Sequence, residues 1–364
     1  MEVVPLGVKS KMRILVLAPY FLPVKGGLIS FVWQTARRLV ERGHSVTVLT
    51  SRLKGMKEEE VIDGISVIRC PSWDVLPSRF SIPLGIPFDR IPRPDVVITH
   101  TRFYLWSFFG GRFAKRHGIR WLHFEHGSSQ VRYDNPIVRF FAWLADSSIG
   151  RWVLKNAKVA GVSKASCEFA RILGAKACEV LYNCVDTKFF NGKRKGHKGV
   201  VIVFANRLII EKGVHDLISA ARNLDVKVLI VGAGPYESEL RAMAGPNVEF
   251  VGEKDAAGVR DAMASADILV NPSYAEGLPT MVLEGGAMGL AVVATDVGGT
   301  REVIEDGKTG FLIKPKDVNI LRERILMLVK DSKLREKFGR GLQKKVREDF
   351  DWERMLDKLE RELA

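Results

Sequence analysis

Two glutamates, Glu276 and Glu284, lie in the segment PSYAEGLPTMVLEGG, which begins like a strand end and continues like a helix. We expect a strand to end at Glu276 and a helix to begin just after it, because Pro279 suits the first position of a helix. A helix start leaves backbone amides without intrahelical partners, and such a start binds phosphate. Glu284 would lie about one and a half turns into this helix, within reach of a ribose diol. The residues expected around the helix start are Gly277, Leu278, Pro279, Thr280 and Met281.

Two cations follow an apolar run in VFANRLIIEKG, where Arg207 and Lys212 lie five residues apart and Gly213 opens a helical stretch. Two cations at the carboxyl end of a strand can clamp a diphosphate. Taken alone, they are more typical of a solvated surface pair, just as the two glutamates alone would fit a capped helix with solvated carboxylates. The presence of both segments in one half of the chain favours a phosphate-binding site.

The elements that must position these residues repeat a strand–helix–strand pattern. In the first half, an apolar run at 12–19 is followed by a loop at Gly26 and Gly27 and by a helical pattern at 30–42, for which Ser30 is a plausible N-cap. Further apolar runs predict strands at 45–50, 95–100, 120–126 and 157–163. Buried strands separated by helices predict an open parallel sheet covered on both faces.

A polar, basic segment at 189–198 (FFNGKRKGHK) is typical of a boundary between domains. After it, a second series of apolar runs alternates with helical stretches such as 213–223 and 255–265. The sequence therefore predicts an N-terminal Rossmann-like domain at 1–188, a linker at 189–198, a C-terminal Rossmann-like domain at 199–345 and a terminal helix at 346–364.

Composition limits the classes of protein. The 364 residues are 46% hydrophobic and 27% charged, and 56 Lys and Arg outnumber 42 Asp and Glu. Residues 1–190 hold 28 of the cations and only 15 of the acidic side chains, so nearly all of the +14 net charge lies in the first half. The spacing of the four cysteines indicates neither a zinc site nor a disulfide framework, which fits a reducing cytoplasm. We find no signal peptide and no apolar stretch long enough to span a bilayer.

In its order and spacing of motifs, the sequence resembles the retaining glycosyltransferases of family four. The resemblance runs nearly end to end and implies an α/β protein with the GT-B fold, in which two Rossmann-like parallel-sheet domains face each other across a deep cleft. The motifs are the Gly26-Gly27 loop, EHG at 125–127, GVSKAS at 161–166, YNCVDTKFF at 182–190, NRLIIEKG at 206–213, VGAGP at 231–235, FVG at 250–252, the glutamates 276 and 284, and FDWERML near the C-terminus.

The resemblance implies roles for these residues in binding a nucleoside-diphosphate sugar. Arg207 and Lys212 would bind the diphosphate and offset the charge of the departing nucleotide, Glu276 would hold the transferred sugar, and Glu284 would hold the ribose. His126 would contact the sugar near the attacking hydroxyl, although an isolated histidine is more often a satisfied core residue. The main chain of Gly26 and Gly27 would approach the phosphates, and that of Val251 and Gly252 the base. Ser163 and Asn183 match family positions without a defined role.

The resemblance also implies a reaction. We see no second carboxylate opposite Glu276 that could act as a nucleophile, and the family is thought to retain configuration by front-face attack. Catalysis would then rest on stabilising the leaving diphosphate, with no metal and no cofactor. The predicted enzyme is a cytoplasmic hexosyltransferase that uses a UDP- or GDP-sugar; the alternatives are a nucleotide-sugar epimerase of the same fold and a protein that binds a nucleotide sugar without turnover.

Two other classes fit poorly. VGAGPYESEL resembles a dinucleotide fingerprint, but Glu237 stands where a third glycine belongs. The basic charge could suggest nucleic acid, but no nucleic-acid-binding motif is present, and we expect no such partner.

The acceptor is expected to be a saccharide or a lipid-linked acceptor bound by the first domain. Segments 103–121 and 136–155 are helical, rich in aromatic residues and flanked by Arg and Lys, a combination that can dock on an anionic membrane surface. The alternative is that their aromatic residues belong to the core. The residues that distinguish these interpretations are Phe140, Phe141, Trp143 and Trp152. Segments 54–61 and 73–94 are expected to form loops at the acceptor cleft.

Overall fold

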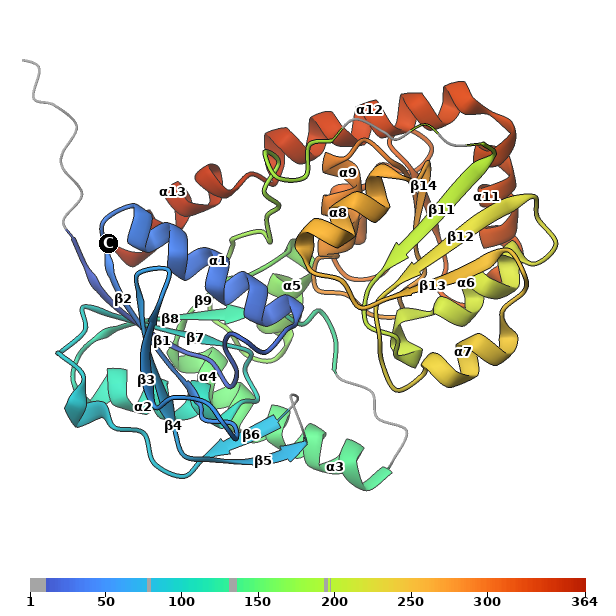
Figure 1. The fold of residues 1–364 in the computed structure, drawn as a ribbon. Helices are drawn as coiled ribbons and strands as arrows, with labels where there is room; N and C mark the ends of the chain where they lie inside the picture. Colours follow the sequence, from blue (N-terminus) through green and yellow to red (C-terminus); the bar gives the residue numbers. More distant parts are fainter. Residues whose placement is uncertain (1–10, 77–79, 131–135, 193–195, 197) are drawn as a thin grey trace, which may run out of the picture.

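The computed structural model describes residues 11–76, 80–130, 136–192, 196 and 198–364. Two α/β domains lie side by side, and the last helices run along both of them (Figure 1). Part of the predicted linker lies outside the described residues.

The N-terminal domain is built on an eight-stranded sheet with the order β10-β9-β8-β7-β1-β2-β4-β3, in which only β3 is antiparallel. Its strands are β1 (Arg13–Leu17), β2 (Ser45–Ser51), β3 (Glu59–Ile62), β4 (Ile65–Cys70), β7 (Val96–His100), β8 (Arg120–Glu125), β9 (Lys158–Gly161) and β10 (Cys178–Val180). A separate hairpin pairs β5 (Ser72–Leu76) with β6 (Phe80–Pro83). Segments 54–61 and 73–94, which were predicted to be loops, therefore contain β3 and this hairpin, because each finds an antiparallel neighbour.

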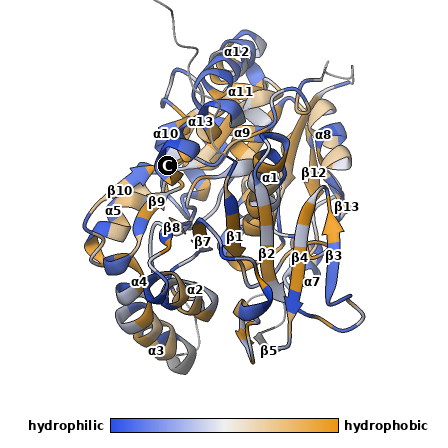
Figure 2. Cartoon of the chain, turned by 90° about the vertical axis from the view of Figure 1, so that its left-hand side faces the viewer, coloured by the Kyte–Doolittle hydropathy of each residue, from blue (hydrophilic) through white to orange (hydrophobic). Residues whose placement is uncertain are grey.

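Helices cover both faces of this sheet. Alternate residues of β1 face opposite sides, so that Ile14 and Val16 join one core cluster, together with residues of α1 (Gly27–Glu41), while Leu15 and Leu17 join a second cluster with α2 (Leu105–Arg116). The remaining helices are α3 (Pro136–Ala145), a π-helical turn at Asp146–Gly150, α4 (Arg151–Asn156), α5 (Lys164–Ile172) and a short 3-10 turn at Phe88–Arg90. α2, α3 and α4 gather at one end of the domain (Figure 2).

The C-terminal domain contains a fully parallel six-stranded sheet with the order β13-β12-β11-β14-β15-β16. Numbered from β11, this order is 3-2-1-4-5-6, that of a doubly wound nucleotide-binding domain whose ligands bind where β11 and β14 diverge. The strands are β11 (Val200–Ala205), β12 (Val226–Val231), β13 (Val248–Gly252), β14 (Ile268–Asn271), β15 (Ala291–Thr295) and β16 (Phe311–Ile313). The helices are a 3-10 turn at Ile210–Lys212, α6 (Val214–Ala221), α7 (Glu237–Met243), α8 (Ala256–Ala264), α9 (Thr280–Ala287), α10 (Thr300–Val303), α11 (Val318–Lys330) and α12 (Ser332–Asp349).

The chain returns to the N-terminal domain through its last helix, α13 (Trp352–Leu363). Four side chains on one face of α13, those of Trp352, Met355, Leu356 and Leu359, are buried, and the helix packs against α1. Because α12 extends to Asp349, the crossing occurs about four residues later than the predicted boundary at 346.

Three local predictions are wrong by a few residues. Ser30 is not an N-cap, since α1 already begins at Gly27. The strand before the two glutamates ends at Asn271 rather than at Glu276, and the intervening residues form a loop. Pro279 is the N-cap of α9 rather than its first helical residue. In the last two cases the loop between the strand and the helix is longer than expected, whereas α1 begins earlier than expected.

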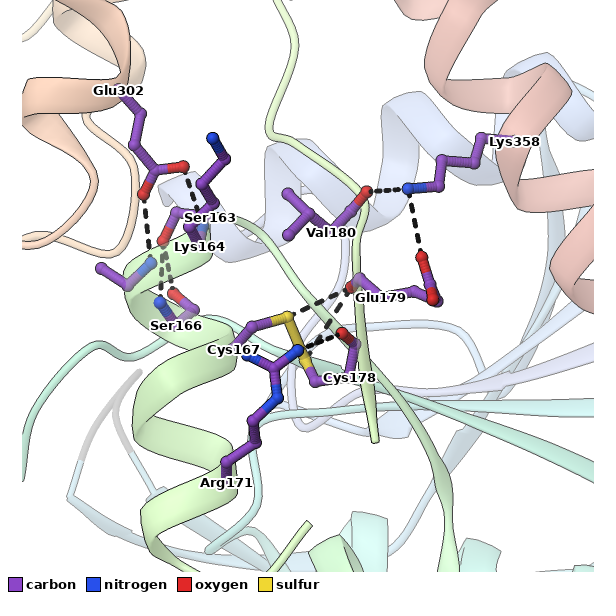
Figure 3. Close-up of a disulfide and its surroundings, with 11 residues drawn as sticks. Ser163, Lys164, Ser166, Cys167, Arg171, Cys178, Glu179, Val180, Glu302 and Lys358 are labelled. Atoms are coloured by element: carbon purple, nitrogen blue, oxygen red, sulfur yellow. Dashed lines mark hydrogen bonds and ion pairs between the residues drawn. A yellow bond between two sulfur atoms is a disulfide. The ribbon is translucent and has the colours of Figure 1, made fainter. Parts of the chain in front are cut away.

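The cysteines also depart from expectation, because Cys167 and Cys178 form a disulfide (Figure 3). The bond joins α5 to β10, two successive elements that pack together, so residues eleven apart in the sequence lie with their Cα atoms 5.4 Å apart. The turn between the two elements brings the sulfurs together, which spacing alone does not reveal. Cys70 and Cys184 are free and buried.

α13 is held on the N-terminal domain by a buried carboxylate. Glu360 is 4% exposed and accepts hydrogen bonds from Arg42 at 3.0 Å and from the ring of His44 at 3.0 Å. Arg42 also pairs with Glu353 of the same helix, whose side chain is 73% exposed. The two glutamates share one partner but differ in burial.

We therefore expect Glu360→Ala to lower the free energy of unfolding by about 2–3 kcal/mol, because it leaves the Arg42 and His44 groups without their buried acceptor. Glu353→Ala should change it by about 0.5 kcal/mol or less, as is usual for exposed ion pairs. Urea denaturation followed by tryptophan fluorescence measures both. Equal losses would show that burial of Glu360 does not hold the helix.

Candidate active site between the two domains

A cavity of about 620 Å³ lies between the domains, walled by the loop after β1 and by α1 on one side and by α8 and α9 on the other. At its mouth Lys25 and Glu253 form an ion pair across the two domains, with 3.3 Å between Nζ and Oε1. The structure therefore brings together residues from distant parts of the sequence. Of the predicted site residues, Gly26, Gly27, Asn183, Thr280 and Glu284 line this cavity.

Lys212 and Glu276 meet where β11 and β14 diverge, at the carboxyl ends of both strands. Lys212 Nζ donates to Glu276 Oε1 at 2.7 Å, and both side chains are largely buried. The sequence predicted both residues but not that they pair. An anionic ligand that binds Lys212 must share the ammonium group with Glu276. The ion pair also holds this ammonium group in position before a ligand arrives.

Glu284 is the carboxylate of the cavity whose charge is least stabilised. Burial raises its pKa to about 7. The nearby start of α9 has no side-chain cap. A hydroxyl group that donates a hydrogen bond to Glu284 would therefore stabilise the ionised carboxylate, which burial disfavours.

On the N-terminal side, the turn that carries His126 is held by buried charges. Glu125 Oε1 accepts from Gly127 N at 2.7 Å and from Arg102 at 2.8 Å, and Arg102 also donates to Asp146 at 2.9 Å. Burial opposes ionisation of Glu125, but Arg102, His123 and the main-chain amide of Gly127 together outweigh it and lower the pKa of Glu125 to about 2. The buried side chain of Glu125 therefore anchors the turn to the protein interior through the main-chain amide of Gly127.

His126 itself is neutral near pH 7, because burial lowers its pKa to about 4 and the Glu125 carboxylate offsets this only in part. Its Nε2 lies 3.1 Å from Nδ1 of His100, and its ring meets the edge of Phe31 at 5.1 Å between centroids. A neutral imidazole in this position can donate or accept a hydrogen bond without adding a charge.

The two halves of the site are in direct contact. Ser128 Oγ donates to the carbonyl of Glu276 at 2.5 Å, and Asn183 Nδ2 donates to the carbonyl of Leu278 at 3.2 Å. A Cβ atom on Gly277 would lie 2.0 Å from the carbonyl oxygen of His126. Only glycine at position 277 permits this approach, which places His126 beside the loop that carries Glu276.

Other predicted residues have different surroundings. Arg207 is exposed and lies beside the Lys212 loop, outside the cavity wall. Val251 and Gly252 end β13, next to Glu253 of the mouth pair. Ser163 is fully buried and caps α5 by accepting from Ser166 N, so its observed contact is structural. Leu278 belongs to the core, and Pro279 caps α9.

Several residues around the site were not predicted from the sequence. They are Lys25, Arg102, Asp146 and His100, whose partners are distant in sequence. The sequence did carry one signal, the polar residues His100, Thr101 and Arg102 at the carboxyl end of an apolar strand. Such positions face the ligand side of a parallel sheet.

Two Rossmann-like domains with a cavity between them are the architecture of the GT-B class. Comparison with protein families supports this class: Glycosyltransferase Family 4 matches residues 25–189, and Glycosyl transferases group 1 matches residues 185–345. The chain belongs to these family 4-type glycosyltransferases.

Relatives and solved structures agree with this assignment. A GDP-mannose-dependent alpha-mannosyltransferase of Mycolicibacterium smegmatis is 30% identical over 333 residues, covering 83% of this chain and 84% of that protein. A phosphatidyl-myo-inositol mannosyltransferase of Mycobacterium leprae is 29% identical and covers 94% of this chain and 93% of its own length. Sucrose-phosphate synthase from Thermosynechococcus elongatus has the same fold, with a TM-score of 0.80, 20% identity and coverage of 97% and 99%. The predicted GT-B fold is confirmed.

The raised pKa of Glu284 predicts a pH-dependent effect on stability. In the unfolded chain this carboxyl has its ordinary pKa of 4.5, whereas burial in the folded protein raises the pKa to about 7. Folding of the wild type is thus progressively disfavoured between these pH values, by at most about 3 kcal/mol above pH 7. Glu284→Gln should raise the melting temperature above pH 7, with the gain disappearing below pH 4.5.

Thermal unfolding from pH 4 to 8 without nucleotide measures this difference. Glu239→Gln, at an exposed position of α7, serves as the control and should show no such trend. A gain that does not depend on pH would mean that the carboxyl of Glu284 is not disfavoured by burial.

Proposed function

We propose that the protein is a retaining, metal-independent hexosyltransferase that takes its sugar from a UDP- or GDP-sugar. The observation that carries the proposal is the buried Lys212–Glu276 pair where β11 and β14 diverge. The pair offers a cation for the diphosphate and a carboxylate for sugar hydroxyls within 2.7 Å of each other.

In this proposal, catalysis is electrostatic. Lys212 stabilises the charge that develops on the leaving diphosphate. Arg207 at the edge of the site and the start of α9 contribute to the same stabilisation. Glu276 orients the sugar, Glu284 accepts from the ribose, and neutral His126 bonds a sugar hydroxyl beside the reacting carbon. The closed contact between the domains excludes water from the reacting groups. The acceptor hydroxyl attacks the face that the diphosphate leaves, and the diphosphate accepts its proton.

We also propose a lipid-linked saccharide or membrane lipid as the acceptor, with the N-terminal domain docked on an anionic membrane surface. Phe140, Phe141 and Trp143 of α3 are each more than 50% exposed, whereas Trp152 packs against Trp121 in the core. Exposed basic side chains occur on α3 and on the neighbouring helices α2 and α4, among them Arg112, Lys115, Arg116, Arg139, Arg151 and Lys155.

Exposed aromatic rings beside basic residues bind anionic bilayers from one side. The relative named as a phosphatidyl-myo-inositol mannosyltransferase supports such an acceptor. None of the helices among the described residues is long and apolar enough to cross a membrane. A cytoplasmic location stays a prediction, and the Cys167–Cys178 bond removes the cysteine argument for it.

The donor site is tested by removing each partner of the buried pair. Lys212→Ala should weaken nucleoside-diphosphate binding and lower turnover at least about a hundredfold, roughly 3 kcal/mol, because the leaving group loses a fixed charge. Glu276→Ala should impair sugar transfer but leave binding of the bare nucleoside diphosphate intact or tighter, because it releases Lys212. Lys227→Ala, at an exposed position of β12, is the control.

Thermal shifts with UDP, GDP, ADP and their sugar conjugates, with and without EDTA, identify the donor before the kinetics are measured. Full activity in both site variants would refute the site. A shift that EDTA abolishes would refute metal independence, and isomerised sugar formed without an acceptor would favour the epimerase.

Membrane docking is tested by flotation with liposomes rich in anionic lipid. The double variant Phe140→Ser/Trp143→Ser should move most of the protein from the floating to the soluble fraction, because it removes the apolar anchor. Ile172→Ser, at an apolar position of α5 that is 77% exposed, should leave the protein in the floating fraction. A wild-type protein that stays entirely soluble would refute the docking surface.

A further inference from the structure

His100 is the last residue of β7, at the carboxyl end of the sheet where β7 and β1 diverge. The glycine loop follows β1 at this same end. His100 is 2% exposed, and its ring stacks on Phe124 at 5.4 Å and lies edge-on to Phe31. Its Nδ1 lies 3.1 Å from Nε2 of His126. The two imidazoles therefore form a hydrogen-bonded pair in an otherwise aromatic pocket.

Only one proton can lie between the two nitrogens. Burial and the neighbouring His126 and His123 lower the pKa of His100 well below its usual value, so both rings of the pair are neutral near pH 7. In a neutral pair, one nitrogen donates and the other accepts. The hydrogen bond therefore ties the tautomer of His126 to that of His100, because a protonated nitrogen on one ring requires an unprotonated nitrogen on the other.

The backbone around the pair restricts it further. Thr101 has φ +62°, a left-handed conformation that is strained for a threonine, and it sends the following Arg102 toward Glu125. Glu125 in turn holds Gly127 N. Residues 100–102 thus hold the turn at 125–127 in two ways. His100 bonds the ring of His126, and Arg102 holds Glu125, which accepts from the main-chain amide of Gly127. Strain of this kind persists where the surrounding structure enforces it, commonly at functional sites.

We propose that His100 is a positioning residue that fixes the ring orientation and tautomer of His126. The inference rests on the proposed function in so far as His126 contacts the transferred sugar. His100 lies behind His126 and acts through it. A ring free to rotate or to exchange tautomers would present the correct hydrogen-bonding nitrogen to the sugar only part of the time.

Three variants test the role. His100→Phe keeps the aromatic packing but removes the hydrogen bond; His100→Asn places a polar group near the position of Nδ1. Thr99→Val is the matched control, because it removes a buried hydroxyl on the preceding residue that bonds His123 and Trp121 but not His126. The melting temperatures of all three variants measure how far each substitution destabilises the fold.

The first readout is NMR of protein labelled with ¹⁵N in its histidines, with His126 assigned by the variant His126→Gln. In the wild type and in Thr99→Val, His126 should show one protonated and one unprotonated ring nitrogen. In His100→Phe the two nitrogen signals should move toward each other as the tautomers exchange, and His100→Asn should separate them again. An unchanged single tautomer in His100→Phe would overturn the proposal.

The second readout is kinetic. His100→Phe should lower kcat about 10- to 100-fold, as loss of such an indirect hydrogen-bond partner typically does. Binding of the bare nucleoside diphosphate should be unchanged, and His100→Asn should recover most of kcat. Equal kcat in His100→Phe and the wild type, or no recovery in His100→Asn, would overturn the proposal. If the wild type transfers sugar from no donor, the proposed function fails, while the NMR comparison still decides the role of His100.

Discussion

The close approach of Gly277 to the carbonyl of His126 is the constraint on which the site depends. It is a main-chain contact between two domains, reinforced by the hydrogen bond from Ser128 to the carbonyl of Glu276. Neither domain alone holds a complete site, because the cation and carboxylates lie on one and the histidine and glycine loop on the other. A side chain at position 277 would separate the two sets of groups by the width of a methyl group or more.

The two domains use different electrostatic means to prepare their parts. In the C-terminal domain, Lys212 and Glu276 hold each other in place, so that no large rearrangement of charge is needed when an anion arrives. In the N-terminal domain, the charges of Arg102 and Glu125 are buried behind the turn, while the ring of His126 on the turn is neutral. Such preorganised groups act strongly because water does not screen them.

Much of the fold could be predicted because apolar runs and their spacing report buried parallel strands directly. The order of motifs also placed Lys212, Glu276 and Glu284 in one domain. Pairings between distant residues could not be predicted: the hydrogen bond between His100 and His126 depends on the register of two strands 24 residues apart, and nothing local marks it. The exposure of α3 was equally hidden, since an apolar helix with basic neighbours has the same pattern in a core and on a surface.

The docking of α13 on α1 has a consequence for how the chain is made. The N-terminal domain is synthesised before the C-terminal domain, yet the helix that covers α1 and supplies Glu360 to Arg42 and His44 leaves the ribosome after both. Until then, the apolar surface that α13 covers has no partner, and the entire C-terminal domain must emerge before it is covered. The order of folding therefore differs from the order of the domains, because the second domain is complete in sequence before the first. A nascent chain that stops before α13 would expose an unfinished N-terminal domain.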